Sequence, residues 1–430
     1  MHVQRLILRN IRSIREFDLH LRPGEWPGWH VILGDNGAGK STVVRALALA
    51  LMGQSNAHAT REDWSRWITD GEKSGLIDVR LRHHDEDEWI GQEGRGDRAI
   101  HAEAKIHTNS GSDQPSGGHA SIKFSSHRYA PRTVWGDGDG WFSASFGPFR
   151  RFSGADPEMD RLYVTHPRFA PHLSAFGENV ALGESLRWLT SLQIRWLDKE
   201  DAEAKKIQGA VIDFINDAKL LPHGARICGV TSEQVWIVDG FGSRVAVQEM
   251  SDGYRSILSM TFELMRLLFS AFGTEAALRS IDMKAGAMTL PGVVAIDEID
   301  AHLHPGWQQL IGDWFVNRFP NMQFLVTTHS PIICRAARHG TIWLLPPPGS
   351  EGQLRRVIGP ERARLIDGNI LDAYGTELFG EEVTRSGQSK AKLMQLAQLN
   401  RKRLRRALSS KEQRELEQLR EAMPSSPNNM

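Results

Sequence analysis

One short stretch of the chain has the residue types and spacing needed to hold a row of phosphate groups: GDNGAGKST, residues 34 to 42. It matches the pattern G-x-x-x-x-G-K-[ST] and lies between a strand-like run and the start of a helix, which is the context that the pattern requires. There, successive backbone N–H groups point into one concavity, and the helix start adds positive potential. Lys40 would reach the β- and γ-phosphates, and Ser41 would ligate Mg²⁺. The residues assigned to phosphate binding are Asn36, Gly37, Ala38, Gly39, Lys40, Ser41 and Thr42.

A second stretch, VVAIDEIDAHLHP at 293 to 305, is an apolar run that ends in two acids. Taken alone, it would be a buried strand with polar residues at its exit. Beside a phosphate-binding loop, Asp297 is the natural partner of a Mg²⁺ ion, and Glu298 could polarise an attacking water.

A third stretch, FLVTTHSP at 324 to 331, is another apolar run, and it ends at His329. A lone histidine at such a position is usually structural. Because two neighbouring strands already carry phosphate chemistry at their carboxyl ends, a contact between His329 and the γ-phosphate is the favoured interpretation.

The stretch SDGYRS, residues 251 to 256, precedes a long apolar helix. Ser251 or Asp252 could cap that helix, and Gly253 would let the chain bend. The alternative is that the helix start also binds a phosphate group.

Apolar periodicity predicts the elements that must position these residues. Strands are predicted at 3–9 and 29–33, in short alternating pieces between 76 and 125, and at 226–248. Helices are predicted at 41–51, 178–219 and 254–271, and a strand–helix–strand unit at 292–328. This order predicts an α/β fold with a mixed sheet.

Composition excludes several classes of protein. Lys plus Arg equals Asp plus Glu at 52 each among 430 residues, so net charge indicates no polyanionic partner. The two cysteines, Cys228 and Cys334, have no metal-type spacing and indicate a reducing compartment. Arg5 and Arg9 interrupt the apolar start, and no apolar run approaches the length of a membrane span. We therefore expect a cytoplasmic protein that does not contact a membrane.

The order of Lys40, Ser251, Asp297 and His329 resembles that of the Walker A, signature, Walker B and H-loop motifs in ATP-binding-cassette ATPases of the RecF and SMC branch. The resemblance covers nearly the whole chain. It implies a P-loop ATPase with ATP and Mg²⁺ as cofactors and Glu298 and His329 as catalytic residues. It also implies that Arg12, in the turn of LILRNIRSIREFDLHL, lies near the nucleotide.

The same resemblance implies a homodimer or higher homo-oligomer with ATP at the interface. Ser251 and Gly253 would face the γ-phosphate held by a second protomer. We do not identify the family's Q-loop glutamine: the region 142–154, where the resemblance implies one, offers Arg150 and Arg151 instead, and the set of Mg²⁺ ligands is left incomplete.

Departures from the family pattern narrow the subfamily. The interval between Walker A and the signature holds only short predicted strands and helices, so we expect no long coiled coil. The residues after His329 show no Glu followed by Asp-x-Asp, so we expect no Toprim nuclease there. The chain is similar to stand-alone bacterial ATPases of the PtuA kind in its runs LHP at 303–305 and FGPFRRFSG at 146–154 and in its compact helical C-terminus. The alternative is an OLD-like ATPase without a Toprim domain.

The predicted division of the chain has four parts. Residues 1–150 form an ATPase lobe with the P-loop, and 151–290 a mainly helical lobe with the signature. Residues 291–345 carry Walker B and the H-loop, and 346–430 form a helical extension that ends in a hairpin.

The tail holds eight basic residues and no acid between residues 385 and 410. They could form a solvated helix, a nucleic-acid contact or a docking surface for a protein. The basic residues are Arg385, Lys390, Lys392, Arg401, Lys402, Arg403, Arg405 and Arg406.

Two functions fit these predictions. In the first, the ATPase controls a separately encoded nuclease, of the HNH type or similar, in defence against phage. In the second, it is a RecF-like repair ATPase that clamps double-stranded DNA.

Overall fold

The computed structural model describes residues 1–87, 99–108, 120–126, 130–136, 140–150, 162, 165–166, 168–177, 182–217, 220–282, 284–350, 352–369, 387–405 and 408–422. The chain divides into two compact units, residues 1–367 and 368–430. The predicted extension from residue 346 is thus shared between them, since 346–367 belong to the first unit.

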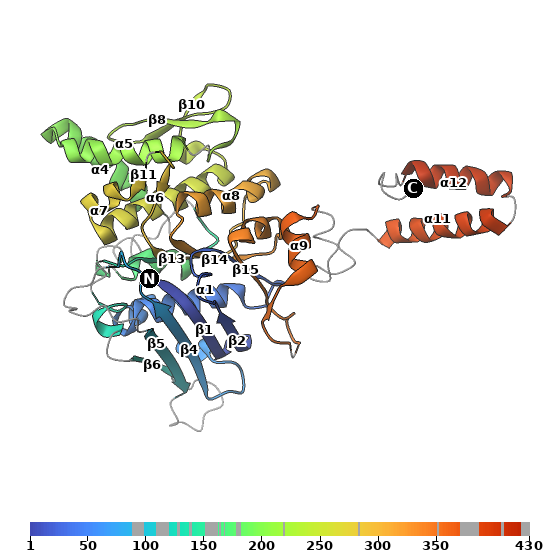
Figure 1. Ribbon diagram of the computed structural model, residues 1–430, viewed down its shortest axis with the longest axis horizontal. Coiled ribbons are helices and arrows are strands. Elements are labelled where there is room, and N and C mark those ends of the chain that lie inside the picture. The colour runs from blue at the N-terminus through green and yellow to red at the C-terminus, as the bar shows by residue number, and fades with distance from the viewer. Residues whose placement is uncertain are drawn as a thin grey trace. The chain divides into compact units, whose positions relative to one another are not determined.

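A six-stranded sheet forms the centre of the first unit (Figure 1). Its strands pair in parallel except at β15–β16. Every residue of β3, β14, β13 and β7 is buried, as expected for parallel strands that are covered on both faces. In spatial order the strands are β16 (Arg355–Arg356), β15 (Gly340–Leu344), β3 (Gly28–Leu33), β14 (Met322–Thr328), β13 (Gly292–Ile296) and β7 (Ser143–Phe146).

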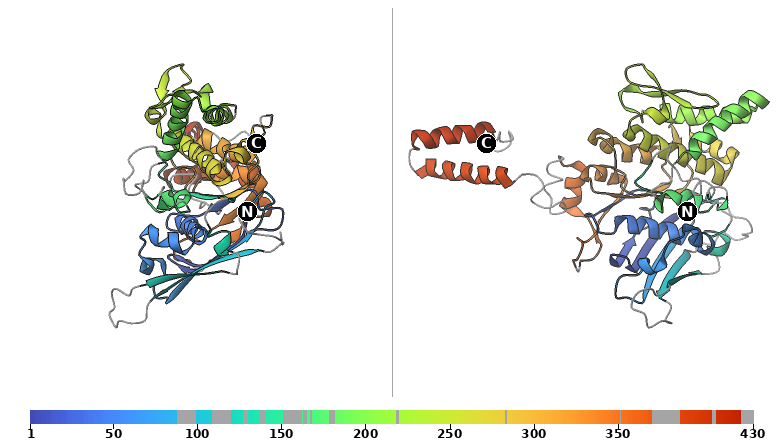
Figure 2. Two further views of the ribbon diagram at one scale, coloured as in Figure 1. Left: turned by 90° about the vertical axis from the view of Figure 1, so that its left-hand side faces the viewer. Right: turned by 180° about the vertical axis from the view of Figure 1, so that it is seen from behind.

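A second sheet of five antiparallel strands alternates between buried apolar and more exposed polar residues. Both views of Figure 2 show its blue and teal strands beside the blue helix α1. Its strands, in spatial order, are β2 (Ile14–His20), β1 (His2–Ile11), β4 (Ser74–Arg82), β5 (Ile100–Thr108) and β6 (Ala120–Ser126).

Helix α1 (Lys40–Met52) joins the two sheets into one core. Eleven of its thirteen residues are buried, so it is apolar on nearly all sides. Its side chains share one cluster with Leu6 and Val79 of the antiparallel sheet and with Val293 and Leu325 of the parallel sheet. The helix that carries Lys40 is therefore fixed from two directions.

The opposite face of the parallel sheet is covered by other helices (Figure 1). Trp29 of β3 stacks on Phe315 of α8 at 6.3 Å between ring centroids, and Phe315 lies 5.2 Å from Phe324 of β14. Besides α1, the helices among the described residues of the first unit are α2 (Gln54–Ala57), α4 (Glu184–Lys199), α5 (Ala202–Asn216), α6 (Asp252–Phe272), α7 (Thr274–Arg279), α8 (Pro305–Arg318) and α9 (Gly359–Asp367).

Smaller elements complete the first unit. A three-stranded sheet consists of β10 (Arg244–Ala246), β9 (Val235–Val238) and β8 (Arg226–Val230), and a two-stranded one of β11 (Ile281–Asp282) and β12 (Ala287–Met288). Short 3-10 turns lie at His58–Thr60, Trp64–Trp67, Ala130–Arg132, Ala170–Ala175, Pro222–Gly224, Val247–Glu249 and Pro331–His339.

The second unit is a hairpin of α11 (Gly387–Arg405) and α12 (Ser410–Ala422). Leu399, Leu416 and Leu419 form its buried core. The predicted capping box is present, because Ser409 Oγ accepts from the Glu412 N–H at 3.3 Å while Glu412 Oε2 accepts from the Ser409 N–H at 3.0 Å.

The structure confirms the predicted α/β fold of P-loop type, with a mixed sheet, helices that include the predicted one after SDGYRS, and a C-terminal helical hairpin. Among the described helices, none has the length and apolar character needed to cross a membrane.

The burial of α1 between two sheets predicts that removing a leucine side chain there lowers the free energy of unfolding more than removing one from an exposed helix position. Leu47→Ala empties a site that is 1% exposed between the two sheets and should lower the free energy of unfolding by about 2–5 kcal/mol. Leu197→Ala on α4 removes the same atoms from a side chain that is 61% exposed and should change it by about 0.5 kcal/mol or less. Urea unfolding of both variants measures the difference, and equal losses would contradict the buried placement of α1.

Candidate active site

Three of the predicted motifs, and also Arg150, follow four adjacent strands of the parallel sheet. The P-loop follows β3, His329 follows β14, Asp297 follows β13, and Arg150 lies just beyond β7. Since the carboxyl ends of parallel strands share one edge, these residues gather at one edge of the sheet, where open α/β sheets bind ligands.

The P-loop is formed by the turn between β3 and α1. Gly39 has a φ of 98°, in the left-handed region that favours glycine. A Cβ there would lie 2.8 Å from Ile14 Cγ1 and 3.1 Å from Ser13 Oγ. The turn between β1 and β2 therefore packs against the P-loop, and only glycine fits at this contact.

Lys40 is buried at the first position of α1, with 5% of its surface exposed. Its Nζ donates to the carbonyl oxygens of Gly34 at 2.9 Å and Asp35 at 3.0 Å and lies 3.4 Å from His329 Nδ1. Burial lowers the pKa of the Lys40 ammonium, and the nearby carboxylates of Glu298 and Asp297 oppose this shift. Among the described residues no carboxylate pairs directly with Nζ, so this buried cation suits an anionic ligand.

The turn after β13 holds the two acids in different environments. Asp297 is 4% exposed, and its Oδ1 accepts a hydrogen bond from Thr327 Oγ1 at 2.6 Å. The same Thr327 oxygen accepts from the Glu298 N–H at 2.9 Å. Glu298 has a φ of 46°, which is uncommon for a residue with a side chain. This turn exposes 38% of the Glu298 side chain at the sheet edge.

His329 lies between Lys40 and Glu298. Its Nε2 is 4.0 Å from Glu298 Oε1, too long for a hydrogen bond. This buried nitrogen has no hydrogen-bond partner among the described residues. A buried, unsatisfied ring nitrogen is costly, and a ligand atom at this place would satisfy it.

The signature stretch begins α6, with Ser251 at the N-cap position. The Ser251 side chain is exposed and makes no capping hydrogen bond, so the cap interpretation is not realised in this conformation. A Cβ on Gly253 would lie 3.1 Å from the carbonyl oxygen of His302 and from Trp307 Cζ3. Tyr254 packs on Trp307 at 4.8 Å between ring centroids. The stretch therefore rests on the segment that follows Walker B.

Arg12 occupies the turn between β1 and β2 with a φ of 52°. Its guanidinium lies 4.4 Å from the centre of a Trp67 ring and 3.1 Å from Glu62 Oε2. Burial lowers the pKa of Arg12, against the effect of the Glu62 carboxylate. Although this turn touches the P-loop, the described partners of the Arg12 side chain are Trp67 and Glu62, and its role toward a nucleotide stays a prediction.

Two residues of the site escaped the sequence interpretation. Thr327 holds both Asp297 and the backbone of Glu298, and Thr328 Oγ1 donates to Asp300. Their signal was the pair of threonines just before His329, since a hydroxyl at the end of a buried strand needs a partner.

The donors and acceptors at this edge fit a nucleoside triphosphate with Mg²⁺. The P-loop supplies the buried cation of Lys40 at the start of α1, and His329 supplies a nitrogen without a hydrogen-bond partner among the described residues. Ser41, partly exposed on α1, and the Asp297 carboxylate supply hard oxygen ligands of the kind that Mg²⁺ prefers.

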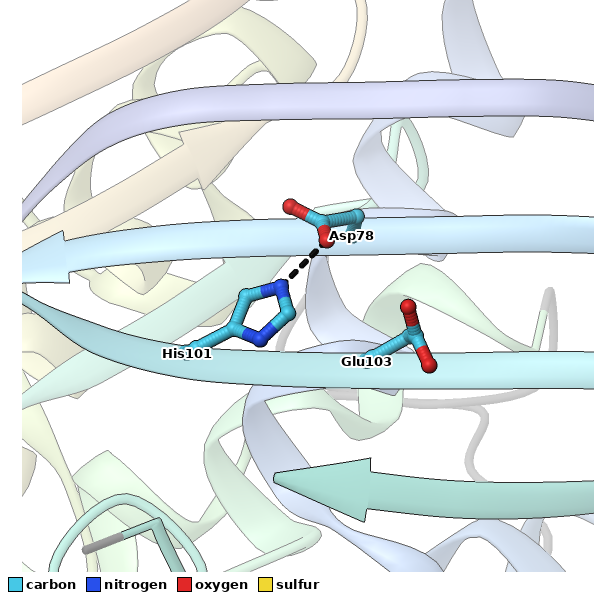
Figure 3. A group of neighbouring side chains, drawn as sticks. All are labelled: Asp78, His101 and Glu103. Carbon is cyan, nitrogen blue, oxygen red and sulfur yellow. Dashed lines mark hydrogen bonds and ion pairs between the residues drawn. The ribbon is translucent and has the colours of Figure 1, made fainter. Parts of the chain in front are cut away.

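A separate cluster lies on the antiparallel sheet, where Asp78, His101 and Glu103 place one ligand atom each within 4.8 Å of one another (Figure 3). His101 Nε2 is hydrogen-bonded to Asp78. Cations also neighbour both acids, since Lys105 Nζ is 2.9 Å from Glu103 Oε1 and Arg80 Nε is 3.7 Å from Asp78 Oδ1. These charges balance one another, so an ion-pair network accounts for the cluster without a metal.

Two family models match the chain. Residues 5–126 match an AAA domain, and residues 148–335 match an AAA domain described as putative AbiEii toxin, Type IV TA system. Between them they include the P-loop, the signature, Walker B and His329.

Three curated relatives are similar in sequence. The Septu protein PtuA of Bacillus mycoides (strain KBAB4) is 24% identical over 347 residues, 80% of this chain and 40% of that protein. The retron Ec83 probable ATPase of Escherichia coli is 39% identical over 109 residues, 25% of this chain and 18% of that protein. The retron Vc95 probable ATPase of Vibrio cholerae serotype O1 biovar El Tor is 28% identical over 167 residues, 37% of this chain and 30% of that protein.

The chain spans less than half the length of each of these relatives. Among solved structures, the SMC head bound to the C-winged helix domain of ScpA aligns with 85% of this chain and 100% of that one, at 16% identity and a TM-score of 0.49. The AAA-domain matches and the curated relatives confirm the predicted resemblance: the chain is similar to AAA-domain proteins and is related to PtuA.

Proposed function

We propose that the chain binds ATP with Mg²⁺ and hydrolyses it at the sheet edge. The observation that carries this proposal is the row of Lys40, His329 and Glu298, in which Nζ is 3.4 Å from Nδ1 and Nε2 is 4.0 Å from the Glu298 carboxylate. A cation, an unsatisfied imidazole nitrogen and a carboxylate thus line one position, as hydrolysis of a terminal phosphate requires.

Each residue has a distinct proposed role. The backbone from Asn36 to Ser41 holds the phosphates, and Lys40 binds the β- and γ-phosphates. Ser41 and Asp297 would hold Mg²⁺, which supplies charge neutralisation between the phosphates when bound. Glu298 accepts a proton from the attacking water, and His329 contacts the γ-phosphate.

We further propose that hydrolysis requires two copies of the chain. Among the described residues, Lys40 contacts its own loop and His329, whereas Gly253 and Tyr254 contact His302 and Trp307. The exposed hydroxyl of Ser251 and the N–H groups of the first α6 turn suit an anion brought by another molecule. A head-to-tail two-fold dimer would place them over the nucleotide of the partner.

The proposed output of this cycle is control of a partner nuclease in defence against phage. The relatives named above belong to Septu and retron systems, which supports a defence role. The C-terminal hairpin is the proposed docking element for that partner. Part of its positive charge is already paired within the hairpin, since Lys402 Nζ lies 3.3 Å from Glu412 Oε1, and Met394 is an apolar side chain that is 69% exposed.

Two substitutions should separate binding from hydrolysis. Lys40→Ala should weaken ATP binding by about ten- to a hundredfold, because hydrogen bonds to charged groups contribute about 1.5–3 kcal/mol. Glu298→Gln should keep binding and lower the single-turnover rate by about 10²- to 10⁴-fold, because a general base acts when water attacks. Lys199→Ala, an exposed lysine at the end of α4, is the control. A Glu298→Gln rate within a few-fold of wild type would assign the base to another residue.

Ser251→Arg should leave ATP binding by the monomer nearly unchanged and block both ATP-dependent dimerisation and hydrolysis. The long cation would fill the space that the partner's phosphate needs. Light scattering with and without ATP, together with a nucleotide-binding titration, measures both effects. Tight ATP-dependent dimers of this variant would leave the motif as a helix start without a role in the dimer.

Mixing Ser251→Arg with Lys40→Ala protein tests the composite site directly. A heterodimer carries one site with both defects and one with neither, so part of the ATPase activity should return if one intact site suffices. Heterodimers that form without recovery would mean that the sites act only as a pair or that Ser251 acts within its own chain.

Deleting residues 386–430 should preserve ATPase activity and abolish capture of the co-expressed nuclease in a pull-down. Met394→Glu should have the same effect in the full chain, because it places a charge on the exposed apolar position, while Gln398→Glu, one turn further on, should not. If the deletion instead weakens binding to duplex DNA and flattens its salt dependence, the hairpin contacts phosphates and the DNA-clamping function is favoured.

A further inference from the structure

Arg150 is a buried arginine whose five hydrogen bonds join three parts of the active site. It is 4% exposed and lies four residues beyond the end of β7. A guanidinium has five N–H donors, so its full capacity is used. Nε donates to Ser256 Oγ at 3.0 Å, Nη1 to the carbonyls of Gly147 at 3.0 Å and Asp297 at 2.8 Å, and Nη2 to those of Glu298 at 3.0 Å and Ile299 at 3.4 Å.

Burying the Arg150 guanidinium costs free energy, which its hydrogen bonds must offset. None of the described carboxylates lies within ion-pair distance of the guanidinium, and all five acceptors are neutral oxygens. Burial lowers the pKa of Arg150 to about 10, with the carboxylates of Asp297 and Asp300 opposing the shift, so the side chain is still protonated at neutral pH. An unpaired buried charge is expensive unless its hydrogen bonds are well made.

The acceptors of Arg150 surround the proposed catalytic base. Glu298 sits in left-handed backbone with φ 46°, a conformation that surrounding contacts must hold in place. On one side of the turn Thr327 binds the N–H groups, accepting from Glu298 at its hydroxyl and from Ile299 at its carbonyl oxygen. On the other side Arg150 binds the carbonyl oxygens of Asp297, Glu298 and Ile299. The direction of the Glu298 side chain therefore depends on Arg150.

The remaining hydrogen bond of Arg150 joins its Nε to Ser256 of α6, the helix that begins with the signature stretch. Ser256 is 2% exposed and lies in the second turn of α6, five residues after Ser251. A shift of the start of α6 would move Ser256 Oγ, and with it the guanidinium that holds the Glu298 turn.

We propose that Arg150 is a positioning residue. It couples the binding of the start of α6 to a phosphate held by a partner protomer to the orientation of Glu298. The proposal rests on the dimeric ATPase function proposed above and adds the connection between its two halves. Hydrolysis then proceeds at full rate only when the signature helix is docked, because docking fixes Ser256, Arg150 and the catalytic turn together.

Ser256→Ala in the full chain is the sharpest test, because it removes one of the five bonds and leaves Arg150 in place. We expect kcat to fall about tenfold with KM and ATP-dependent dimerisation unchanged, as for loss of an interaction needed only in the transition state. Ser256→Thr keeps the hydroxyl and should restore most of the rate. Arg150→Lys keeps the charge without the planar fork and should lower kcat by about a hundredfold.

Ser259→Ala is the matched control. Ser259 is also buried on α6, and its hydroxyl donates to the Ser256 carbonyl at 3.2 Å rather than to a side chain. It should retain the wild-type kcat. Equal kcat values for Ser256→Ala and Ser259→Ala would overturn the coupling, as would a Ser256→Ala protein whose affinity, dimerisation and thermal midpoint all fall with kcat. A wild-type chain that binds no ATP or does not dimerise with ATP would instead contradict the proposed function itself.

Discussion

The geometry of the active site depends on one strained turn, in which Glu298 follows β13 in left-handed backbone. A residue with a side chain adopts this conformation at a cost of about 1–3 kcal/mol, which surrounding contacts must offset. Here the amide side of the turn is bound by Thr327 and the carbonyl side by Arg150. Because the turn cannot relax toward either side, the carboxylate stays at the sheet edge beside His329 and Lys40.

The second constraint is the position of α1 between two sheets. A P-loop needs its lysine and its helix start in a fixed place, and a helix that is anchored on one side only could rock. The antiparallel sheet packs on the second side of α1 through Leu6 and Val79. Ile14, the first residue of β2, packs against Gly39 of the P-loop. The antiparallel sheet therefore helps to fix the P-loop of the candidate site.

The residues that the sequence singled out for the candidate site are those whose pattern is local. Nine consecutive residues specify the P-loop, and the two acids and His329 each end an apolar run. Arg150 could not be assigned in this way, because four of its five acceptors are backbone carbonyls without a residue-type signal. Thr327 left only the signal of a hydroxyl at the end of a buried strand, and its partner Asp297 lies 30 residues away. The contact of Arg12 could not be predicted for the same reason. Its turn was predicted, but its guanidinium stacks on Trp67, which lies 55 residues further along the chain.

The arginine at position 150 also has a consequence for the metal. The resembled family carries a glutamine in this region, and its carbonyl oxygen can accept a hydrogen bond or ligate a cation. A guanidinium offers five donors and no acceptor, and all five are directed at oxygens of the chain itself. Arg150 therefore cannot enter the coordination of a Mg²⁺ ion, whose remaining ligands beyond the proposed Ser41 and Asp297 must be phosphate, water or other side chains. The hydrogen bonds of Arg150 instead connect the turn that holds Glu298 to Ser256 of α6.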